Sequence, residues 1–333
     1  MTELSKPSFS TEIQPADTPG ALGQAAELLS QGQLVALPTE TVYGLAADAR
    51  SHEAVSRIFE AKGRPAGNPL IIHVDSVGMA RDCVVTWPSA AAQLAKAFWP
   101  GPLSLVLPKA DLIPDIVTAG GVTVAVRCPV HPVMRGVLAK CSFPLAAPSA
   151  NRSTCLSPTR AEHVVDQLGG RIPLVLDGGA CAVGIESTVL DLTGVTPTLL
   201  RPGSISLGQL QAILGAVESA RPVTDAGPVK SPGQLARHYS PRAKLELGDV
   251  PAAAIGEASE GTHVIAREPA PPAWPSERWH QLPDNPEGFA RELYDTMHRC
   301  DQHGAEIIRV QPLPDTDEWA ALRDRLTRAS TGK

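Results

Sequence analysis

The 333-residue sequence lacks the cysteine patterns of zinc-binding and disulfide-stabilised proteins. Its six cysteines are scattered, and no two of them are spaced as Cys-x-x-Cys. This spacing favours a protein of a reducing compartment over a metal-bound or disulfide-linked scaffold. The six positions are Cys83, Cys128, Cys141, Cys155, Cys181 and Cys300.

Aromatic residues are also scarce, at 4%, whereas 32 prolines and 28 glycines predict many turns. Hydrophobic residues make up 43% of the chain, which is enough for a sizeable core. No run of 18 apolar residues occurs, and residues 1–17 hold no apolar segment of the signal-peptide kind. We therefore expect a soluble, cytoplasmic protein that does not enter a membrane.

Positive charge is in short supply as well, because the formal net charge is -6 and acidic residues outnumber basic ones in both halves. A large positively charged surface for nucleic acid is therefore not expected, although the composition does not exclude local basic patches. The P-loop, the dinucleotide-binding glycine motif, the nucleophile elbow and the HExxH motif are all missing. If this chain binds a nucleotide, it must do so by other means.

Short apolar runs alternate with helical patterns along the first two thirds of the chain. Helices are predicted at about residues 51–63, 89–98, 131–140, 159–168 and 206–214, with Ser51 as an N-cap and Gly63 just past the end of its helix. The runs "PLIIHV", "LSLVLP", "VTVAVR", "PLVLD" and "STVLDL" read as strands. Because several connections are too short for a crossover helix, we predict an α/β fold with a twisted, mixed parallel and antiparallel sheet and flanking helices.

Composition divides the chain into three parts. Residues 15–215 carry the alternating pattern and form the first expected domain. Residues 216–245 are rich in proline, glycine and serine and read as a linker. Residues 246–333 predict a small C-terminal α/β domain with a strand, a long helix, a second strand and a final helix.

Polar side chains gather where the predicted strands of the first domain end. Directly after the apolar run "QLVAL", the segment "LPTETVYGL" places Thr41 among other polar groups. Lys62 and Arg64 follow a helix in a loop with Asn68, where they could clamp phosphates or simply form a basic helix end. His73 lies in the next strand, either in the core or at a cleft.

Further candidates follow the same logic. Because side chains alternate along a strand with a two-residue period, Thr123 and Arg127 lie on the same face. They are either ligand-binding residues or ordinary surface residues. The polar residues Ser149 and Asn151 fit no regular structural pattern, whereas Ser157 followed by Pro158 predicts a helix N-cap. The strand-end residues Ser187 and Arg201 complete a set that suggests a cleft for a small anionic ligand.

Six ordered segments carry a resemblance to a known family: "LPTETVYGLAADA", "KGRPAGNPLIIHV", "FWPGPLSLVL", "VAVRCPVHP", "APSANRSTCLSPT" and "DGGACAVGIESTVLD". Over about residues 15–215 the chain resembles the YrdC-like family. The segment "SPGQLARHYSPRAKL" and the domain after it resemble the longer, two-domain branch, the threonylcarbamoyl-AMP synthases. The family fold is a twisted, mixed α/β sheet with a positively charged cavity.

The resemblance implies a nucleotidyltransferase that joins L-threonine, bicarbonate or CO2, and ATP into L-threonylcarbamoyladenylate, with release of pyrophosphate. Mg2+ would accompany ATP, and no side chain is predicted to bind a metal. The product would pass to a separate tRNA threonylcarbamoyl-transferase complex. The resemblance assigns Thr41, His73, Arg127, Ser149 and Ser187 to L-threonine, and Lys62, Arg64, Asn68, Thr123, Asn151, Ser157, Arg201 and Tyr239 to ATP.

Within this assignment Lys62 and Arg64 would stabilise the phosphates, and Tyr239 would close over the cavity as a lid. One departure concerns Ser153-Thr154, where the family often has Ser-Gly. Two other functions remain open. One is an RNA-binding module without adenylate chemistry, against which the acidic composition counts. The other is a related carbamoyl transfer, which normally accompanies zinc-finger modules that this cysteine pattern lacks.

Overall fold

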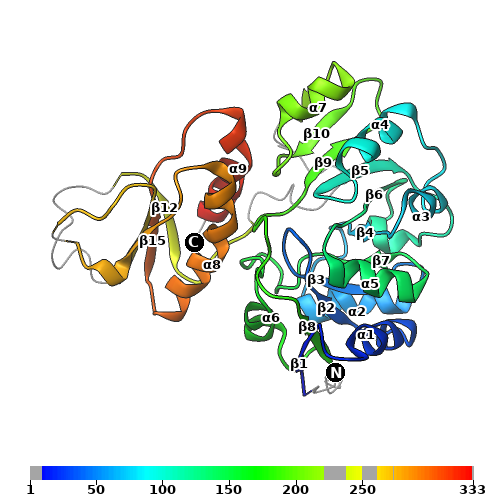
Figure 1. Cartoon of the computed structure of the whole chain (residues 1–333), viewed down its shortest axis with the longest axis horizontal. Coiled ribbons are helices and arrows are strands. Elements are labelled where there is room, and N and C mark those ends of the chain that lie inside the picture. Colours follow the sequence, from blue (N-terminus) through cyan, green and yellow to red (C-terminus); the bar gives the residue numbers. More distant parts are fainter. Residues whose placement is uncertain (1–9, 221–237, 250–260, 273, 332–333) are drawn as a thin grey trace.

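The computed structural model describes residues 10–220, 238–249, 261–272 and 274–331, which form a larger and a smaller lobe (Figure 1). Residues 10–220 build the larger lobe around an eleven-stranded sheet. From edge to edge its strands are β1 (Glu12–Pro15), β8 (Leu174–Asp177), β2 (Val35–Leu37), β3 (Gly44–Asp48), β7 (Leu145–Ala146), β4 (Ile71–His73), β6 (Thr123–Arg127), β5 (Leu103–Pro108), β9 (Thr188–Asp191), β10 (Thr198–Arg201) and β11 (Glu218–Ser219).

Both strand directions occur in this sheet, as the short connections predict. β2 and β3 are antiparallel neighbours, as are β3 and β7, and β5 and β6. β4 and β6 are parallel, and so are β5 and β9. The prediction of a mixed sheet is confirmed.

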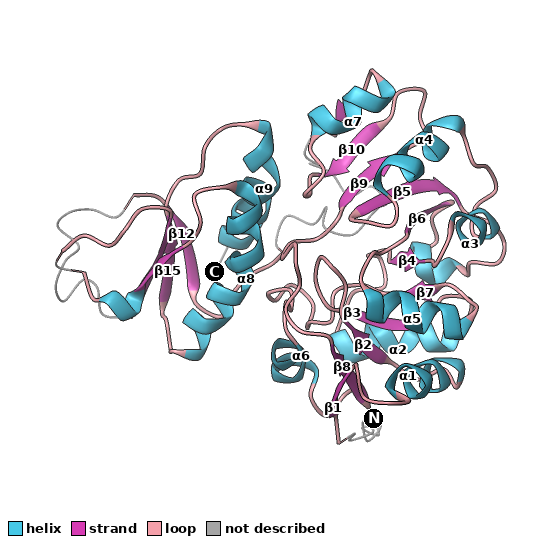
Figure 2. Cartoon of the chain, in the orientation of Figure 1, coloured by secondary structure: helices cyan, strands magenta, loops and turns pink. Residues whose placement is uncertain are grey.

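Helices cover both faces of the sheet (Figure 2). Alternate residues of one strand therefore enter different cores: Val35 and Leu37 pack with α1 and α5, whereas Leu34 and Ala36 join the cluster on the α2 side. Burial on both faces explains why the strands read as continuous apolar runs. The helices are α1 (Ala21–Ser30), α2 (His52–Lys62), α3 (Val77–Asp82), α4 (Ser89–Phe98), α5 (Pro132–Cys141), α6 (Ala161–Leu168) and α7 (Leu207–Leu214).

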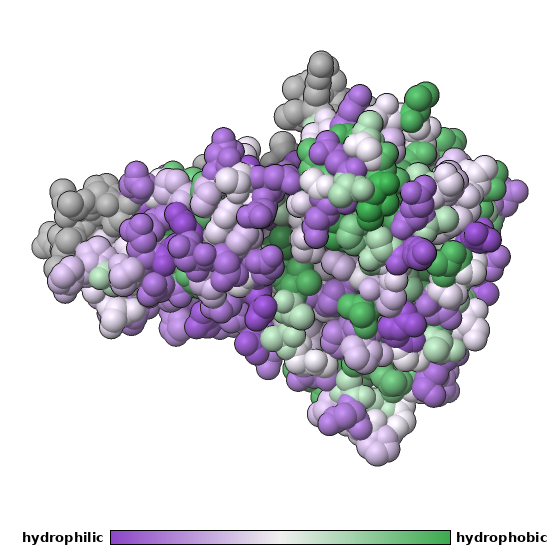
Figure 3. Space-filling model, turned by 45° about the horizontal axis from the view of Figure 1, so that its top comes forward, coloured by the Kyte–Doolittle hydropathy of each residue, from purple (hydrophilic) through white to green (hydrophobic). Residues whose placement is uncertain are grey.

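The smaller lobe has a parallel sheet in the order β12 (Lys244–Leu247), β15 (Ile307–Val310), β13 (Thr262–Ala266) and β14 (Trp279–Gln281). Helices α8 (Pro286–Gln302) and α9 (Ala320–Ser330) lie between this sheet and the larger lobe (Figure 1). The visible face of this lobe is largely hydrophilic, whereas the larger lobe shows more hydrophobic atoms (Figure 3).

A shared hydrophobic cluster joins the two lobes. Val42, Leu156 and Ile185 of the larger lobe pack in one buried group with Leu293 and Tyr294 of α8. The packing of α8 against these residues therefore buries apolar surface between the two lobes. No helix among the described residues is both long and apolar enough to cross a membrane.

The structure confirms the predicted cap of one helix and contradicts that of another. Ser51 caps α2 by accepting a hydrogen bond from the Ala54 N–H, and Gly63 follows the helix with φ +60°. The prediction of Ser157 as an N-cap is wrong, because α6 begins at Ala161 and Arg160 occupies the cap position. The Ser157 hydroxyl instead donates to a Glu186 carboxylate oxygen at 2.5 Å.

Most of the expected linker, residues 221–237, lies outside the described residues. At its two ends the structure shows regular elements that the sequence pattern did not predict. Glu218–Ser219 forms β11, and β12 begins at Lys244.

The departure at Thr154 coincides with a strained turn. Thr154 has φ +69°, a left-handed conformation that glycine adopts freely and a β-branched residue rarely does. The turn also carries a contact, since the Thr154 carbonyl accepts from the Ser240 N–H at 2.9 Å. The loop keeps a glycine-type shape although the glycine is absent.

We expect Thr154→Gly to raise the free energy of unfolding by about 1 kcal/mol, because it removes the left-handed strain. Urea unfolding of the purified protein measures this difference. The matched control is Ser153→Gly at the preceding position, whose φ is not positive; it should gain no stability. Equal effects of the two glycines would contradict the explanation.

Candidate functional site

A cavity of about 40 Å3 lies among the strand ends of the larger lobe. That volume holds only a few water molecules, so a larger ligand requires the surrounding side chains to move apart. Its walls bring together segments far apart in the sequence. They consist of Thr39, Thr41, Val42, Gly44, Arg64, Ile71, His73, Arg127, Ala147, Pro148, Ser149, Glu186, Ser187, Arg201, His238 and Tyr239.

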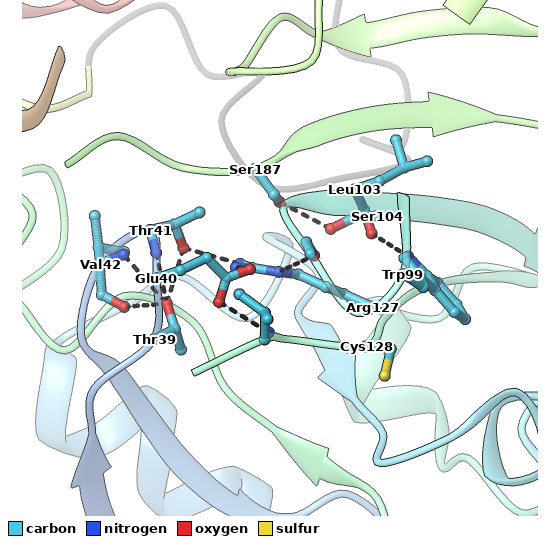
Figure 4. Close-up of polar contacts among 12 residues, drawn as sticks. Thr39, Glu40, Thr41, Val42, Trp99, Leu103, Ser104, Arg127, Cys128 and Ser187 are labelled. Atoms are coloured by element: carbon cyan, nitrogen blue, oxygen red, sulfur yellow. Dashed lines mark hydrogen bonds and ion pairs between the residues drawn. The ribbon is translucent and has the colours of Figure 1, made fainter. Parts of the chain in front are cut away.

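Arg127 is the central cation of this cavity (Figure 4). It ends β6 and lies in register with His73 of β4 and Ser104 of β5. Its Nη2 lies 2.6 Å from Glu40 Oε1, and its Nη1 donates to Thr41 Oγ1 at 2.9 Å. A planar guanidinium at this place can accept a ligand carboxylate in the position where Glu40 now stands.

The loop after β2 explains most of the polar residues in "LPTETVYGL". The Thr39 hydroxyl accepts hydrogen bonds from the N–H groups of Thr41 and Val42 and donates to the Val42 carbonyl. The Tyr43 hydroxyl donates to the Gly179 carbonyl at 2.8 Å. These side chains shape the loop, whereas Glu40 and Thr41 contact Arg127 directly.

Lys62 and Arg64 both turn into the protein, so they are more than a basic helix end. The Lys62 Nζ donates to the carbonyls of Ser149, at 2.6 Å, and Asn151. Arg64 donates to the Asn68 and Pro69 carbonyls. Burial lowers the pKa of Lys62 well below its usual value and that of Arg64 to about 9, with the Arg64 charge adding to the effect at Lys62. Buried cations of this kind favour an anionic ligand.

Asn68 and His73 both have buried polar atoms without a protein partner among the described residues. The amide nitrogen and oxygen of Asn68 and the Nδ1 of His73 have no hydrogen-bond partner within the described part of the chain. Buried polar atoms are normally paired, so these atoms suit a bound ligand or water. Burial and the Arg127 charge lower the pKa of His73 to about 3, so its imidazole is neutral.

Ser187 and Arg201 form the opposite wall. Arg201 donates to the Ser187 carbonyl at 3.0 Å and to its hydroxyl at 3.1 Å. The Ser187 hydroxyl also lies 2.8 Å from the Ser104 hydroxyl (Figure 4). Tyr239 lies against the same cavity with φ +62° and is 1% exposed. Its position suits the predicted lid, whose motion stays a prediction.

All five residues predicted to bind L-threonine line the cavity. So do Arg64, Arg201 and Tyr239, which are among the residues predicted to bind ATP. Lys62, Asn68, Asn151 and Ser157 are buried but are not in its lining. Thr123 is furthest removed, because it begins the strand that Arg127 ends. None of these assignments is tested by a bound ligand, so the binding roles stay predictions.

Sequence reasoning missed two ionisable cavity-lining residues, Glu186 and His238, and three residues that contact the lining, which are Ser104, Arg325 and Glu40. Glu186, His238, Ser104 and Arg325 were not singled out, although Glu186 interrupts the otherwise small and apolar segment "VGIESTVL". In "LPTETVYGL" only Thr41 was assigned to a ligand, yet the neighbouring Glu40 binds Arg127. A carboxylate in an apolar segment is the signal that could have found Glu186.

One group of metal-ligating side chains occurs among the described residues, and it lies in the smaller lobe. His263, His280 and Cys300 have ligand atoms within 4.8 Å of one another. His263 Nδ1 and His280 Nε2 are 2.9 Å apart, so these two nitrogens form a hydrogen bond with each other. Glu186 lines the cavity and Glu40 contacts its Arg127, and both carboxylates are paired with arginines.

Two parts of the chain match known protein families. Residues 27–203 match the family profile Sua5/YciO/YrdC, described as "Telomere recombination". Residues 205–331 match a profile described as "Threonylcarbamoyl-AMP synthase, C-terminal domain". The chain belongs to the threonylcarbamoyl-AMP synthase family. It is a family of enzymes, and the expected resemblance is confirmed.

Relatives and solved structures agree with the family. Threonylcarbamoyl-AMP synthases from Pyrococcus abyssi and Bacillus subtilis are each 39% identical to this chain, over 92% and 94% of it and 93% of each relative. The crystal structure of P. abyssi Sua5 complexed with L-threonine has a TM-score of 0.88 at 37% identity, with 97% of both chains covered. Escherichia coli YciO shares the fold alone, with a TM-score of 0.51 at 22% identity over 59% of this chain and 95% of YciO.

Buried histidines predict a loss of stability in acid. Burial lowers the pKa values of His73, His163 and His238 to about 3 each. Below about pH 6.5 the unfolded chain binds protons at these histidines and the folded chain does not. Their contribution to stability is therefore present above pH 6.5 and is lost as the pH falls toward 3.

We expect the free energy of unfolding to fall by about 1.4 kcal/mol per pH unit for each such histidine below pH 6. Urea unfolding at pH 7.5, 5.5 and 4.5 measures the slope. His163 does not line the cavity, so His163→Asn should reduce the slope by about one proton. An unchanged slope in that variant would contradict the pKa shift.

Proposed function

We propose that this chain catalyses the synthesis of L-threonylcarbamoyladenylate from L-threonine, bicarbonate or CO2, and ATP, with release of pyrophosphate. The observation that carries the proposal is the cavity in which a strand-end arginine, Arg127, meets the buried cations Arg64 and Arg201. Family membership supports it, as does the L-threonine in the solved P. abyssi relative. An RNA-binding module without adenylate chemistry has no comparable support.

In this proposal the threonine carboxylate takes the place of Glu40 on Arg127. Both groups are carboxylates, and the guanidinium lies 2.6 Å from the one now bound. The neighbouring Thr41, Ser149 and Ser187 supply polar groups around the same cavity, and His73 supplies a neutral imidazole.

The chemistry requires placement and charge more than a covalent intermediate. The threonine amine would form a carbamate, either with CO2 and loss of a proton or with bicarbonate and loss of water. A carbamate oxygen would then attack the α-phosphorus of ATP, and the P–O bond to pyrophosphate would break. Good orientation of two bound reactants accounts for about 7–11 kcal/mol of a barrier. Lys62, Arg64 and Arg201 would offset the negative charge that develops on the phosphates.

ATP would enter as its Mg2+ complex. Glu186, a carboxylate in the cavity lining, is paired with Arg325, so the ion would be held by phosphate oxygens and water, as is usual for Mg2+. The adenylate would pass to a tRNA threonylcarbamoyl-transferase complex. A cytoplasmic location remains our prediction.

Pyrophosphate release from ATP by the purified protein tests this function, with L-threonine and bicarbonate omitted in turn. We expect release only when both are present. Release without threonine would indicate another acceptor. No release from folded protein with Mg2+ would contradict the proposal and favour the binding-module alternative.

We expect Arg127→Ala to raise the KM for L-threonine about 10- to 100-fold, because hydrogen bonds to a charged group contribute about 1.5–3 kcal/mol. The KM for ATP should change little. Arg50→Ala serves as the control, since Arg50 pairs with Asp48 at the surface. A parallel rise in both KM values would contradict a carboxylate-binding role and indicate general damage to the site.

A further inference from the structure

Arg325 belongs to the last helix, α9, yet most of its polar contacts lie in the larger lobe. The side chain is fully buried, and its Nε donates to Glu186 Oε2 at 2.8 Å. Its Nη2 donates to the carbonyls of Pro202, at 3.0 Å, and Glu186. Within its own lobe it pairs with the adjacent Asp324. The side chain therefore crosses from one lobe into the wall of the other.

The acceptor of this contact is a cavity residue. Glu186 lines the cavity and is 7% exposed. One of its oxygens accepts from the Ser157 hydroxyl, and the other accepts from Arg325 and from the Tyr294 hydroxyl at 3.4 Å. A second contact from α8 reaches Ser157 itself, since His298 Nε2 lies 3.1 Å from its carbonyl oxygen. Two helices of the smaller lobe thus hold this wall.

Charge explains why the contact matters to a ligand. Glu186 is a buried carboxylate beside Arg201, and burial alone would disfavour its charged form. Arg325 and Arg201 offset this penalty, and the pKa of Glu186 stays below its usual value. Without Arg325, Arg201 would be the main remaining cation for Glu186. It would then be drawn away from Ser187, to which it now donates twice.

Tyr239 depends on the same guanidinium. The Arg325 guanidinium carbon lies 5.1 Å from the centre of the Tyr239 ring, within cation–π range. Tyr239 also stacks on Tyr294 of α8, with ring centres 6.0 Å apart. The residue predicted to cover the cavity therefore rests on the smaller lobe.

We propose that Arg325 is a positioning residue for the nucleotide side of the site: it neutralises Glu186, which keeps Ser157 and Arg201 in place for ATP. The inference rests on the proposed function for the identity of the ligand. It assigns the smaller lobe a role in nucleotide binding, exerted through Glu186 rather than by direct contact with the substrate.

The test compares Arg325→Met, Glu186→Gln/Arg325→Met and the wild type by ATP affinity in calorimetry and by KM. For Arg325→Met we expect ATP affinity to fall and the KM for ATP to rise at least about tenfold, with the KM for threonine within about threefold of wild type. The double variant should return the KM for ATP to within about threefold, because no buried carboxylate is left to neutralise. A purely structural role would not produce this rescue.

Arg323→Met is the matched control. Arg323 lies on the same helix but pairs with the exposed Asp315, away from the cavity. It should leave both KM values unchanged. If Arg325→Met does not fold, as judged by circular dichroism, Arg325→Gln takes its place with the same expected outcomes.

The outcomes separate this proposal from the proposed function. Unchanged ATP affinity in Arg325→Met, or no rescue in the double variant, overturns the positioning role while the synthase function stands. A wild type that binds ATP but releases no pyrophosphate overturns the function, and the affinity comparison still decides the role of Arg325. A wild type that binds no ATP overturns both.

Discussion

The buried ion pair between Arg127 and Glu40 is the contact on which the site depends. It joins the end of β6 to the loop after β2, and both side chains are almost fully buried, at 5% and 6% exposure. Removing one partner from such a pair leaves an uncompensated charge, which typically costs about 3–5 kcal/mol. In the proposed function a ligand carboxylate would replace Glu40 and keep the charge on Arg127 paired. In the structure the ion pair holds the loop after β2 against the end of β6.

A second buried pair, Glu186 with Arg325, performs a related task at the opposite wall. Both carboxylates are matched by arginines, so the remaining cations, Lys62, Arg64 and Arg201, determine the charge offered to a ligand. A cavity of this polarity suits phosphates although the whole chain is acidic. The two pairs also differ in location. The first lies within the larger lobe, and the second brings the smaller lobe to the site.

Much of the fold followed from local patterns. Alternating apolar runs and helix signals such as Ser51 and Gly63 predicted elements that the structure shows, because capping and burial act over a few residues. The N-cap prediction for Ser157 failed because its hydroxyl found a stronger, charged acceptor in Glu186, 29 residues away. Local reasoning has no access to such a partner.

The sequence by itself determined the α/β class, the family and half of the cavity-lining residues, since ordered motifs and strand-end polar groups are properties of neighbouring residues. Only the tertiary structure decided which charges are paired. It placed Glu40 on Arg127, and it brought Arg325 to Glu186, 139 residues away along the chain. The physical reason is that the pKa and availability of a buried charge depend on the groups packed around it, and packing joins residues that are distant in sequence.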